Sequence, residues 1–171
     1  PFINPVLSEA KRWNLTPSLM LAIMHTESHF NPKAESHIPA YGLMQIVPSS
    51  AGKDVQRLIY KRDSAPTSSM LFNPDTNIQH GCAYLHILNY RYLKAIKNKA
   101  AREHCCIAAY NTGAGNVAKA FTGKTNVRSA AKIINQMTPE AVYQHLRKNL
   151  THKEARDYVY KVNQYKSVYS A

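Results

Sequence analysis

A glutamate at position 27 interrupts an apolar stripe and is the first candidate for chemistry in the sequence. A capping residue before Pro17 predicts that a helix begins there. Met20, Ile23 and Met24 form a stripe at helical spacing, and Glu27 is the next position on that stripe. Burial raises the pKa of a carboxyl group, so Glu27 could hold a proton near neutral pH and act as a general acid. The alternative is a partly exposed glutamate at a helix end, and the stripe alone does not separate the two.

Two later stretches carry polar groups that suit a ligand site. Residues 42–46 read Gly-Leu-Met-Gln-Ile. In this stretch Gly42 permits a close backbone approach, Met44 is a flexible apolar side chain, and Gln45 offers both a hydrogen-bond donor and an acceptor. Residues 109–113 read Ala-Tyr-Asn-Thr-Gly, where a hydroxyl and an amide precede a glycine. The end of a helix at that glycine would also explain the asparagine without any ligand.

Glu27-Ser28, residues 42–46 and residues 109–113 resemble, in this order, the three motifs of the lytic transglycosylases. Residues 51–55 and 135–139 resemble a membrane-bound branch of that family. The resemblance implies a mainly α, lysozyme-like helical domain of the SLT type, related to goose-type lysozyme, with a sugar-binding groove. It also implies an enzyme that cleaves the β-1,4 bond between N-acetylmuramic acid and N-acetylglucosamine in the glycan strands of peptidoglycan.

The resemblance implies that one carboxyl group acts first as acid and then as base. Glu27 would protonate the glycosidic oxygen, and the N-acetyl group of the substrate would assist departure. The carboxylate would then take the proton of the muramyl C6 hydroxyl, which gives a 1,6-anhydro sugar. Ordinary glycosidases need a second carboxylate, but a polar loop and a helix start explain the next acids, Glu35 and Asp54, better than catalysis does. The alternatives are a goose-type lysozyme that transfers to water and, less favoured, a nonenzymatic peptidoglycan-binding protein.

Further side chains are implied as substrate contacts. Ser36 stands where the family has a serine that orients the acid or the N-acetyl group, although a loop serine equally often satisfies nearby backbone. Tyr110 would hydrogen-bond the catalytic carboxyl group, and Tyr158 would line the groove. A phenol that donates to Glu27 favours the ionised carboxylate and so opposes the effect of burial on its pKa. The substrate-binding residues predicted in this way are Ser36, Met44, Gln45, Tyr110, Asn111 and Tyr158.

The elements that position these residues read as one helical domain over residues 1–171. Hydrophobic residues make up 44% and charged residues 19% of the chain, as in ordinary globular proteins. Thr151 and Glu154 have capping-box spacing, which explains Glu154 better than catalysis does. The predicted elements are helices that begin at Pro17, Pro74 and Pro139, a helix over about 101–110, a final helix that Thr151 caps, and loops over about 31–39 and 63–69.

The net charge points to an anionic partner. The chain has 22 Lys and Arg against 10 Asp and Glu, a formal net charge of +12. Such a charge attracts nucleic acid, an acidic membrane or an acidic cell-wall polymer. Nucleic acid is the least favoured of the three, because the basic residues are scattered along the chain without a recognition motif.

We expect no metal and no cofactor. His25 and His29 flank Glu27 at a spacing of four, but the further ligand pattern of a zinc site is missing. The three cysteines also match no metal or redox pattern. Free buried thiols are expected at Cys82, Cys105 and Cys106, and a bridge between Cys82 and one of the other two is the alternative.

The sequence itself shows no targeting or membrane-spanning segment. No apolar run approaches the roughly 20 residues that span a bilayer, and no secretion signal opens the chain. We read the chain, which starts at Pro1 without an initiator methionine, as a mature or shortened form. The resemblance implies a bacterial periplasmic location, with a possible outer-membrane tether through a segment absent from this sequence. We expect a monomer.

Overall fold

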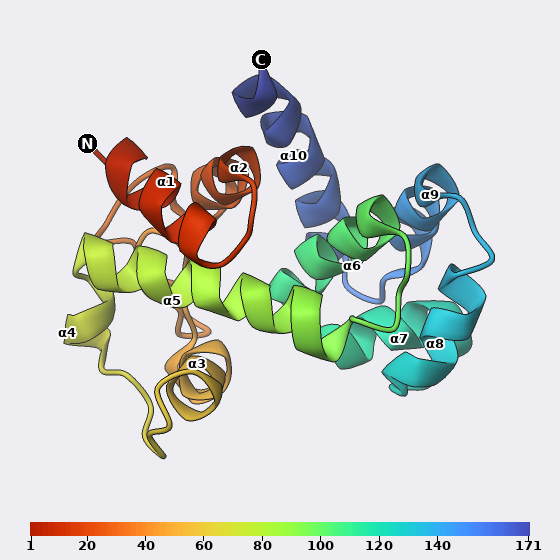
Figure 1. Ribbon diagram of the computed structural model, residues 1–171, viewed down its shortest axis with the longest axis horizontal. Helices are drawn as coiled ribbons and strands as arrows, with labels where there is room; N and C mark the ends of the chain where they lie inside the picture. Colours follow the sequence, from red (N-terminus) through yellow and green to blue (C-terminus); the bar gives the residue numbers. More distant parts are fainter. The chain divides into compact units, whose positions relative to one another are not determined.

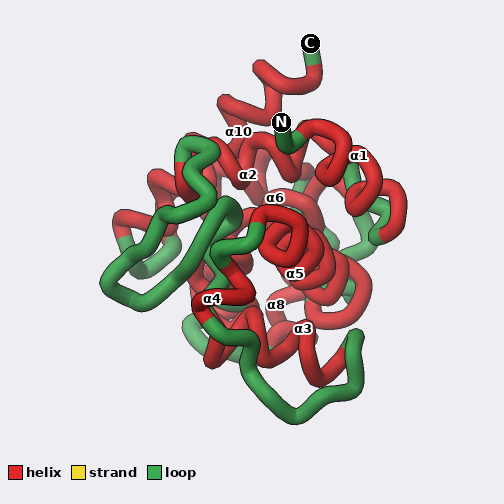
Figure 2. The backbone as a smooth tube through the Cα atoms, turned by 90° about the vertical axis from the view of Figure 1, so that its left-hand side faces the viewer, coloured by secondary structure: helices red, strands yellow, loops and turns green.

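Helices carry nearly all of the regular structure in residues 1–171, all of which the computed structural model describes (Figure 1). Figure 2 shows helices and loops without a strand. The strand-like pairing is confined to isolated bridges that join Tyr41 to Glu35 and to Ile46. The mainly α class predicted from the sequence is therefore confirmed.

The chain divides into two compact units, and each is described by itself. Unit 1 comprises Pro1–His86 and Gln164–Ala171, and unit 2 comprises Ile87–Asn163. The elements of unit 1 are α1 (Ile3–Arg12), α2 (Pro17–Ser28), the short π-helix η1 (Pro48–Gly52), α3 (Lys53–Leu58), α4 (Ser68–Leu71), most of α5 (Pro74–Ile87) and the end of α10 (Lys153–Ser170). Unit 2 contains the short π-helix η2 (Leu88–Tyr92), α6 (Lys99–Thr112), α7 (Ala114–Thr122), α8 (Val127–Ile134), α9 (Pro139–Asn149) and most of α10. The single domain predicted over 1–171 stays a prediction.

The core of unit 1 is built around the apolar stripe of α2. Met20, Ile23 and Met24 are fully buried, as their helical spacing predicted. The Sγ atom of Cys82 on α5 lies 3.3 Å from Sδ of Met20, so α5 packs directly on α2. Helix α1 packs on α2 as well. The helix that carries Glu27 is thus held by two neighbouring helices.

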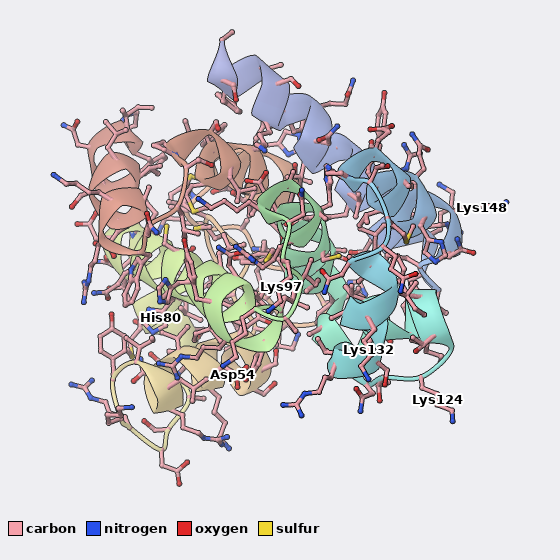
Figure 3. The ribbon with its side chains drawn as sticks, turned by 45° about the vertical axis from the view of Figure 1, so that its right-hand side comes forward. Asp54, His80, Lys97, Lys124, Lys132 and Lys148 are labelled. Carbon is pink, nitrogen blue, oxygen red and sulfur yellow. The ribbon has the colours of Figure 1, made fainter.

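A buried polar pair joins α3 to α5 inside unit 1. His80, labelled in Figure 3, donates from Nδ1 to the carbonyl oxygen of Thr76 at 2.9 Å. Its Nε2 accepts from the Nε2 amide of Gln56 at 2.8 Å, because that amide nitrogen can only donate. Both side chains are buried, and burial lowers the pKa of His80. The fold therefore requires a neutral His80.

This requirement predicts that the protein loses stability in mild acid. Unfolded, His80 has its ordinary pKa of 6.5, whereas folding lowers it, so the unfolded state takes up the proton first as the pH falls. The stability that comes from His80 is complete above pH 6.5 and is lost below it, at no more than about 1.4 kcal/mol per pH unit. Urea unfolding at pH 7.5 and 5.5 should show a flatter pH dependence in His80→Gln than in the control His37→Gln, which alters an exposed histidine. Equal pH dependence in the two variants would contradict this account.

The core of unit 2 relies on small side chains. Helix α6 packs on α7 and α9, and α7 packs on α8. Five alanines on these helices are almost completely buried: Ala108, Ala109, Ala118, Ala130 and Ala131. Small residues at helix contacts allow a close approach of the backbones, and the larger buried side chains fill the space around them.

The pattern of a capping side chain directly before a proline predicted three helix starts correctly. Helices α2, α5 and α9 begin at Pro17, Pro74 and Pro139. Asn73 Oδ1 accepts from the Thr76 backbone N–H and Thr138 Oγ1 accepts from that of Ala141, each at 3.1 Å. Thr16 makes no such side-chain bond, so Pro17 begins α2 without a side-chain cap. The helix expected over about 101–110 is α6, which is longer because Asn98 caps it earlier.

Two local predictions need correction. The last helix, α10, begins at Lys153, one residue later than a cap at Thr151 predicts, and Arg156 Nη1 donates to the carbonyls of Leu150 and Thr151 at 2.6 and 3.1 Å. The predicted loop over 63–69 gives way to α4 from Ser68, where Thr67 Oγ1 accepts from the Met70 N–H at 3.1 Å.

The three cysteines are free and buried, as the preferred interpretation of the sequence predicted. Burial raises the pKa of all three thiols, to about 12 for Cys105. They are therefore core residues with little thiolate character.

Candidate active site

Glu27 lies in the last turn of α2, half-buried at the end of the apolar stripe. Helix α2 ends at Ser28, and the next two residues, His29 and Phe30, adopt left-handed φ angles of 52° and 62°. Left-handed backbone is unfavourable for residues other than glycine and is held only where the surroundings enforce it. The chain therefore turns away sharply just after Glu27, and its carboxyl group is neither in the core nor fully in solvent.

A buried serine joins this helix end to the second motif. Ser28 Oγ donates to the carbonyl oxygen of Leu43 at 2.7 Å and contacts that of Met24 at 3.2 Å. Ser28 directly follows Glu27 in the chain, and Leu43 is the second residue of the stretch 42–46. The hydrogen bond therefore fixes the turn of the second motif next to the carboxylate.

The second motif folds as a tight turn. The backbone groups of Tyr41 and Ile46 exchange two hydrogen bonds of 3.0 Å, which close a loop of four residues. Within it Gly42 has φ +78° and Gln45 has φ +50°, so two of the four residues are left-handed. The Gly42 N–H donates to the carbonyl of Ala34 at 2.8 Å, which attaches the turn to the preceding loop.

The side chain of Asn77 on α5 holds the turn of residues 42–46 by hydrogen bonds. Its Oδ1 accepts from the Met44 N–H at 2.7 Å, and its Nδ2 donates to the carbonyls of Tyr41 and Leu71, both at 2.8 Å. The side chain is fully buried, and all three bonds reach backbone groups. Sequence reasoning missed this residue. The available signal was a polar side chain next to Ile78 in the apolar pattern of the helix from Pro74.

The third motif lies in unit 2, at the junction of α6 and α7. Tyr110 and Asn111 occupy the last turn of α6, which ends at Thr112, and Gly113 follows with φ +90°. Asn116 Nδ2 donates to the carbonyl and the Oγ1 of Thr112 at 2.8 and 3.1 Å and stabilises the junction. The helix end predicted at the glycine is confirmed. Tyr110 and Asn111 are both half-exposed.

The family model described as "Transglycosylase SLT domain" matches residues 4–138 of the chain. The chain belongs to this family. The matched segment contains Glu27, the turn of residues 42–46 and the α6–α7 junction.

Curated relatives narrow the similarity within the SLT family. The chain is 45% identical over 168 residues to membrane-bound lytic murein transglycosylase C of Cronobacter sakazakii, which covers 98% of this chain and 46% of that protein. It is 46% identical over 162 residues to the protein of the same name from Salmonella typhimurium, covering 95% and 44%. The chain thus spans less than half the length of these relatives.

Solved structures of SLT proteins share the fold. Lytic transglycosylase Slt of Pseudomonas aeruginosa matches with a TM-score of 0.73 and 26% identity over 98% of this chain and 23% of that one. The 70-kDa soluble lytic transglycosylase of Escherichia coli matches with a TM-score of 0.66 and 27% identity over 95% and 23%. These likenesses confirm the lysozyme-like SLT fold predicted from the motifs.

Gln45 has less hydrogen-bonding capacity for a ligand than the SLT motif alone suggested. Its Nε2 donates to the carbonyls of Ala34 and Gly42, both at 3.1 Å. Both amide protons are therefore used inside the protein. The side chain is half-exposed, and the contact of its Oε1 with a sugar N–H stays a prediction.

Ser36 serves the backbone of its own loop. Its Oγ accepts from the Ala40 N–H at 3.1 Å, and its N–H donates to the Ala40 carbonyl at 3.0 Å. The Ser36 hydroxyl therefore satisfies nearby backbone, as one of the two interpretations of the sequence predicted. The hydroxyl proton is a donor in addition to this contact, so a role toward substrate stays a prediction.

Met44 and Tyr158 lie deeper than the prediction of direct substrate contacts assumed. Met44 is fully buried, and its Sδ sits where a side chain on Gly81 of α5 would have to go. Tyr158 on α10 is 5% exposed. Buried side chains present little surface to a ligand, and Met44 packs between the turn and α5. The substrate contacts of Met44 and of Tyr158 stay predictions.

Four of the predicted site residues belong to unit 1: Glu27, Ser36, Met44 and Gln45. The hydrogen bond from Ser28 to Leu43 connects the helix end of Glu27 to the turn of residues 42–46. The Ala34 carbonyl, which accepts from Gly42 and Gln45, connects that turn to the loop of Ser36. Tyr110, Asn111 and Tyr158 belong to unit 2. Their predicted roles toward Glu27 and substrate remain predictions.

An aromatic cluster braces the end of α2 inside unit 1. The His25 ring stacks on Tyr165 of α10 with a centroid distance of 3.7 Å and an angle of 13°, and His25 Nδ1 lies 3.0 Å from the Tyr169 hydroxyl. His29 and Phe30 contact the same imidazole ring with centroid distances of 5.3 and 5.5 Å. Burial, with a smaller effect of His29, lowers the pKa of His25. The histidines that flank Glu27 therefore belong to an aromatic packing unit.

Removal of the Tyr169 hydroxyl group should measure how much its contact with His25 stabilises the fold. We expect Tyr169→Phe to lower the free energy of unfolding by about 1 kcal/mol, because His25 loses its partner at a half-buried position. The matched control is Tyr160→Phe on the same helix, which keeps the ring under the Arg147 guanidinium and changes an exposed hydroxyl. Urea denaturation gives both values, and an equal loss in the two variants would show that the His25 contact contributes nothing.

Proposed function

We propose that this chain is the catalytic domain of a peptidoglycan lytic transglycosylase. It cleaves the β-1,4 bond between N-acetylmuramic acid and N-acetylglucosamine and leaves a 1,6-anhydromuramic acid end. The observation that carries the proposal is the single half-buried Glu27, held beside the turn of residues 42–46 by the Ser28 to Leu43 hydrogen bond. Membership of the SLT family and the names of the curated relatives support it.

In this mechanism Glu27 first donates its proton to the glycosidic oxygen. The substrate's N-acetyl oxygen assists at the anomeric carbon as the bond breaks. The ionised Glu27 then takes the proton from the muramyl C6 hydroxyl, whose oxygen closes the anhydro ring, so the carboxyl group ends protonated as it began. Gln45 Oε1 accepts from the N-acetyl N–H and thereby orients that group.

The surroundings of Glu27 support a one-carboxylate mechanism. A retaining or inverting glycosidase places a second carboxylate across the scissile bond. In unit 1 Glu35 is exposed in its loop, and Asp54, labelled in Figure 3, lies in the first turn of α3. The Pseudomonas structure is of a glutamate-to-glutamine mutant described as inactive, which agrees with a single essential glutamate.

The names of the same relatives support a substrate and a location for this chain. Their names include "murein" and "membrane-bound", and another solved structure is a complex of the 70-kDa soluble enzyme with bulgecin A. We infer that this chain acts on peptidoglycan strands in the bacterial periplasm, as a monomer that a further segment could tether to the outer membrane. None of its helices combines the length and the apolar character needed to cross a bilayer.

Digestion of purified peptidoglycan tests the proposal. Mass spectrometry should find fragments that end in 1,6-anhydromuramic acid. Fragments with only reducing-end muramic acid would identify a goose-type hydrolase. Tight binding without any fragment would identify a nonenzymatic binding protein.

A further inference from the structure

The positive charge of the chain is concentrated in unit 2. Unit 2 contains 14 Lys and Arg against four Asp and Glu, whereas unit 1 contains eight against six. Between Asp75 and Glu140 the chain has nine Lys and Arg and one acidic residue, Glu103. The basic residues are therefore enriched in one continuous segment of the chain.

The fold gathers two of these basic segments. Asn135, just after α8, accepts from the Lys97 backbone N–H at 2.8 Å and donates to the Ala95 carbonyl at 3.0 Å. Arg102 holds the same loop from inside, with Nη1 donating to the Ile96 carbonyl at 2.6 Å. The loop between η2 and α6 is thereby fixed against the end of α8.

The exposed side of α8 continues this basic surface. Arg128 and Lys132 precede Asn135 by seven and three residues, so all three lie on one face of the helix. Lys124 stands in the turn before α8, where the Thr122 hydroxyl oxygen accepts from its backbone N–H at 3.1 Å. Figure 3 labels Lys97, Lys124 and Lys132. We call the exposed cations of the loop before α6, of the start of α6, of the turn before α8 and of α8 itself the basic face; they are Lys94, Lys97, Lys99, Lys124, Arg128 and Lys132.

The six cations of the basic face are available to a partner. All six residues are exposed, and none of them takes part in an ion pair of the structure. Like charges placed together without counter-charges repel one another and cost stability. An anion that binds there would relieve this repulsion.

The composition of the basic face favours a flexible polymer that carries carboxylates. Five of its six cations are lysines, which act as solvated point charges and lack the fork that arginine offers to phosphate. The large apolar side chains exposed nearby are Tyr92 and Ile133, too few for the apolar side of a membrane-bound helix. The substrate of the proposed function is itself a polymer whose peptides end in carboxylates.

We propose that the basic face binds the carboxylates of the stem peptides of peptidoglycan, in addition to the glycan contacts around Glu27. This inference rests on the proposed function for the identity of the polymer. Electrostatic attachment of one part of a polymer raises the effective concentration of the rest at the same protein. The basic face thus serves to retain the substrate, and its effect must weaken as salt screens the charges.

Binding to insoluble peptidoglycan sacculi tests the basic face separately from catalysis. All proteins carry Glu27→Gln, so that sacculi stay intact during a pelleting assay. The test variant has Lys94, Lys97 and Lys132 changed to Gln. The matched control has Lys11, Lys33 and Lys61 changed to Gln, which removes the same charge from exposed positions of unit 1. Circular dichroism confirms that each protein is folded.

The test variant should bind sacculi about tenfold more weakly at low salt, and the control less than about twofold more weakly. Sacculi whose carboxylates have been amidated should bind the parent protein as weakly as untreated sacculi bind the test variant. Equal binding by test and control variants, or undiminished binding to amidated sacculi, would overturn the proposal. A loss confined to phosphatidylglycerol vesicles or to DNA would also overturn it and would identify a phosphate partner.

The same experiment separates this proposal from the proposed function. If the wild type produces anhydro ends but the three lysines of the test variant do not affect binding, the basic face alone is disproved. If those lysines control binding but the wild type produces no anhydro ends, the proposed reaction fails and the basic face is a peptidoglycan-binding surface.

Discussion

Glu27→Gln should abolish turnover and leave the fold intact. The amide keeps the shape of the side chain but can neither donate an acidic proton to the glycosidic oxygen nor accept one from the C6 hydroxyl. Loss of general acid and base catalysis lowers the rate by at least about 10³-fold. Because Glu27 is half-buried at a helix end, the free energy of unfolding should change by less than about 1 kcal/mol. Release of soluble fragments from peptidoglycan and urea denaturation measure the two effects.

Glu35→Gln is the control for this experiment. Glu35 is the next acid along the chain and belongs to the same unit, but its side chain is exposed in the loop before Ser36. The same chemical change there should leave turnover within about twofold of the wild type. A large loss in Glu35→Gln, or retained turnover in Glu27→Gln, would contradict the one-carboxylate mechanism.

Gly42→Ala should disrupt the turn of residues 42–46. At φ +78° a side chain is unfavourable, and an added Cβ would overlap the Asn77 side-chain amide and the Leu71 carbonyl. Relief of this overlap must break buried hydrogen bonds of Asn77, each of which costs about 1–3 kcal/mol when left unsatisfied. We expect the free energy of unfolding to fall by about 3 kcal/mol or more, with loss of most turnover because Leu43 no longer holds Ser28.

Gly123→Ala separates the two causes. Gly123 has nearly the same backbone conformation, with φ +80°, but no atom lies within 4 Å of the added Cβ. This substitution should cost only about 1 kcal/mol, the backbone penalty alone. Similar losses in the two variants, measured by urea denaturation, would show that the close approach of Asn77 to Gly42 does not matter.

Local signals were enough to predict several helix starts and the candidate acid. A capping side chain before a proline determines a helix start from two neighbouring residues, as at Pro74 and Pro139. The apolar period of α2 placed Glu27 on the core side of its helix, where the structure shows it half-buried. The helix starts and this stripe depend on residues within a few turns of one another, which is why the sequence predicts them.

The remaining features of the site depend on contacts that are distant in sequence. Asn77 holds a turn that lies more than 30 residues before it in the chain. The carbonyl of Ala34 accepts hydrogen bonds from the Gly42 backbone N–H and from the Gln45 side chain in that turn. Burial of Met44 against Gly81 requires the packing of that turn on α5. In the basic face, the Asn135 side chain likewise joins the end of α8 to the loop before α6, about 40 residues earlier in the chain. No local pattern shows which of these partners will meet.

The fate of water in the reaction tests the central claim about Glu27 most directly. Purified peptidoglycan is digested with the wild-type chain in water enriched in ¹⁸O, and the new glycan ends are examined by mass spectrometry. If Glu27 accepts the proton of the C6 hydroxyl as proposed, the new ends lack one molecule of water and carry no ¹⁸O. New muramic acid ends that contain ¹⁸O, in excess of the ends that exchange their anomeric oxygen in a control without enzyme, would show that water, and not the C6 hydroxyl, attacks the anomeric carbon, and would contradict the account.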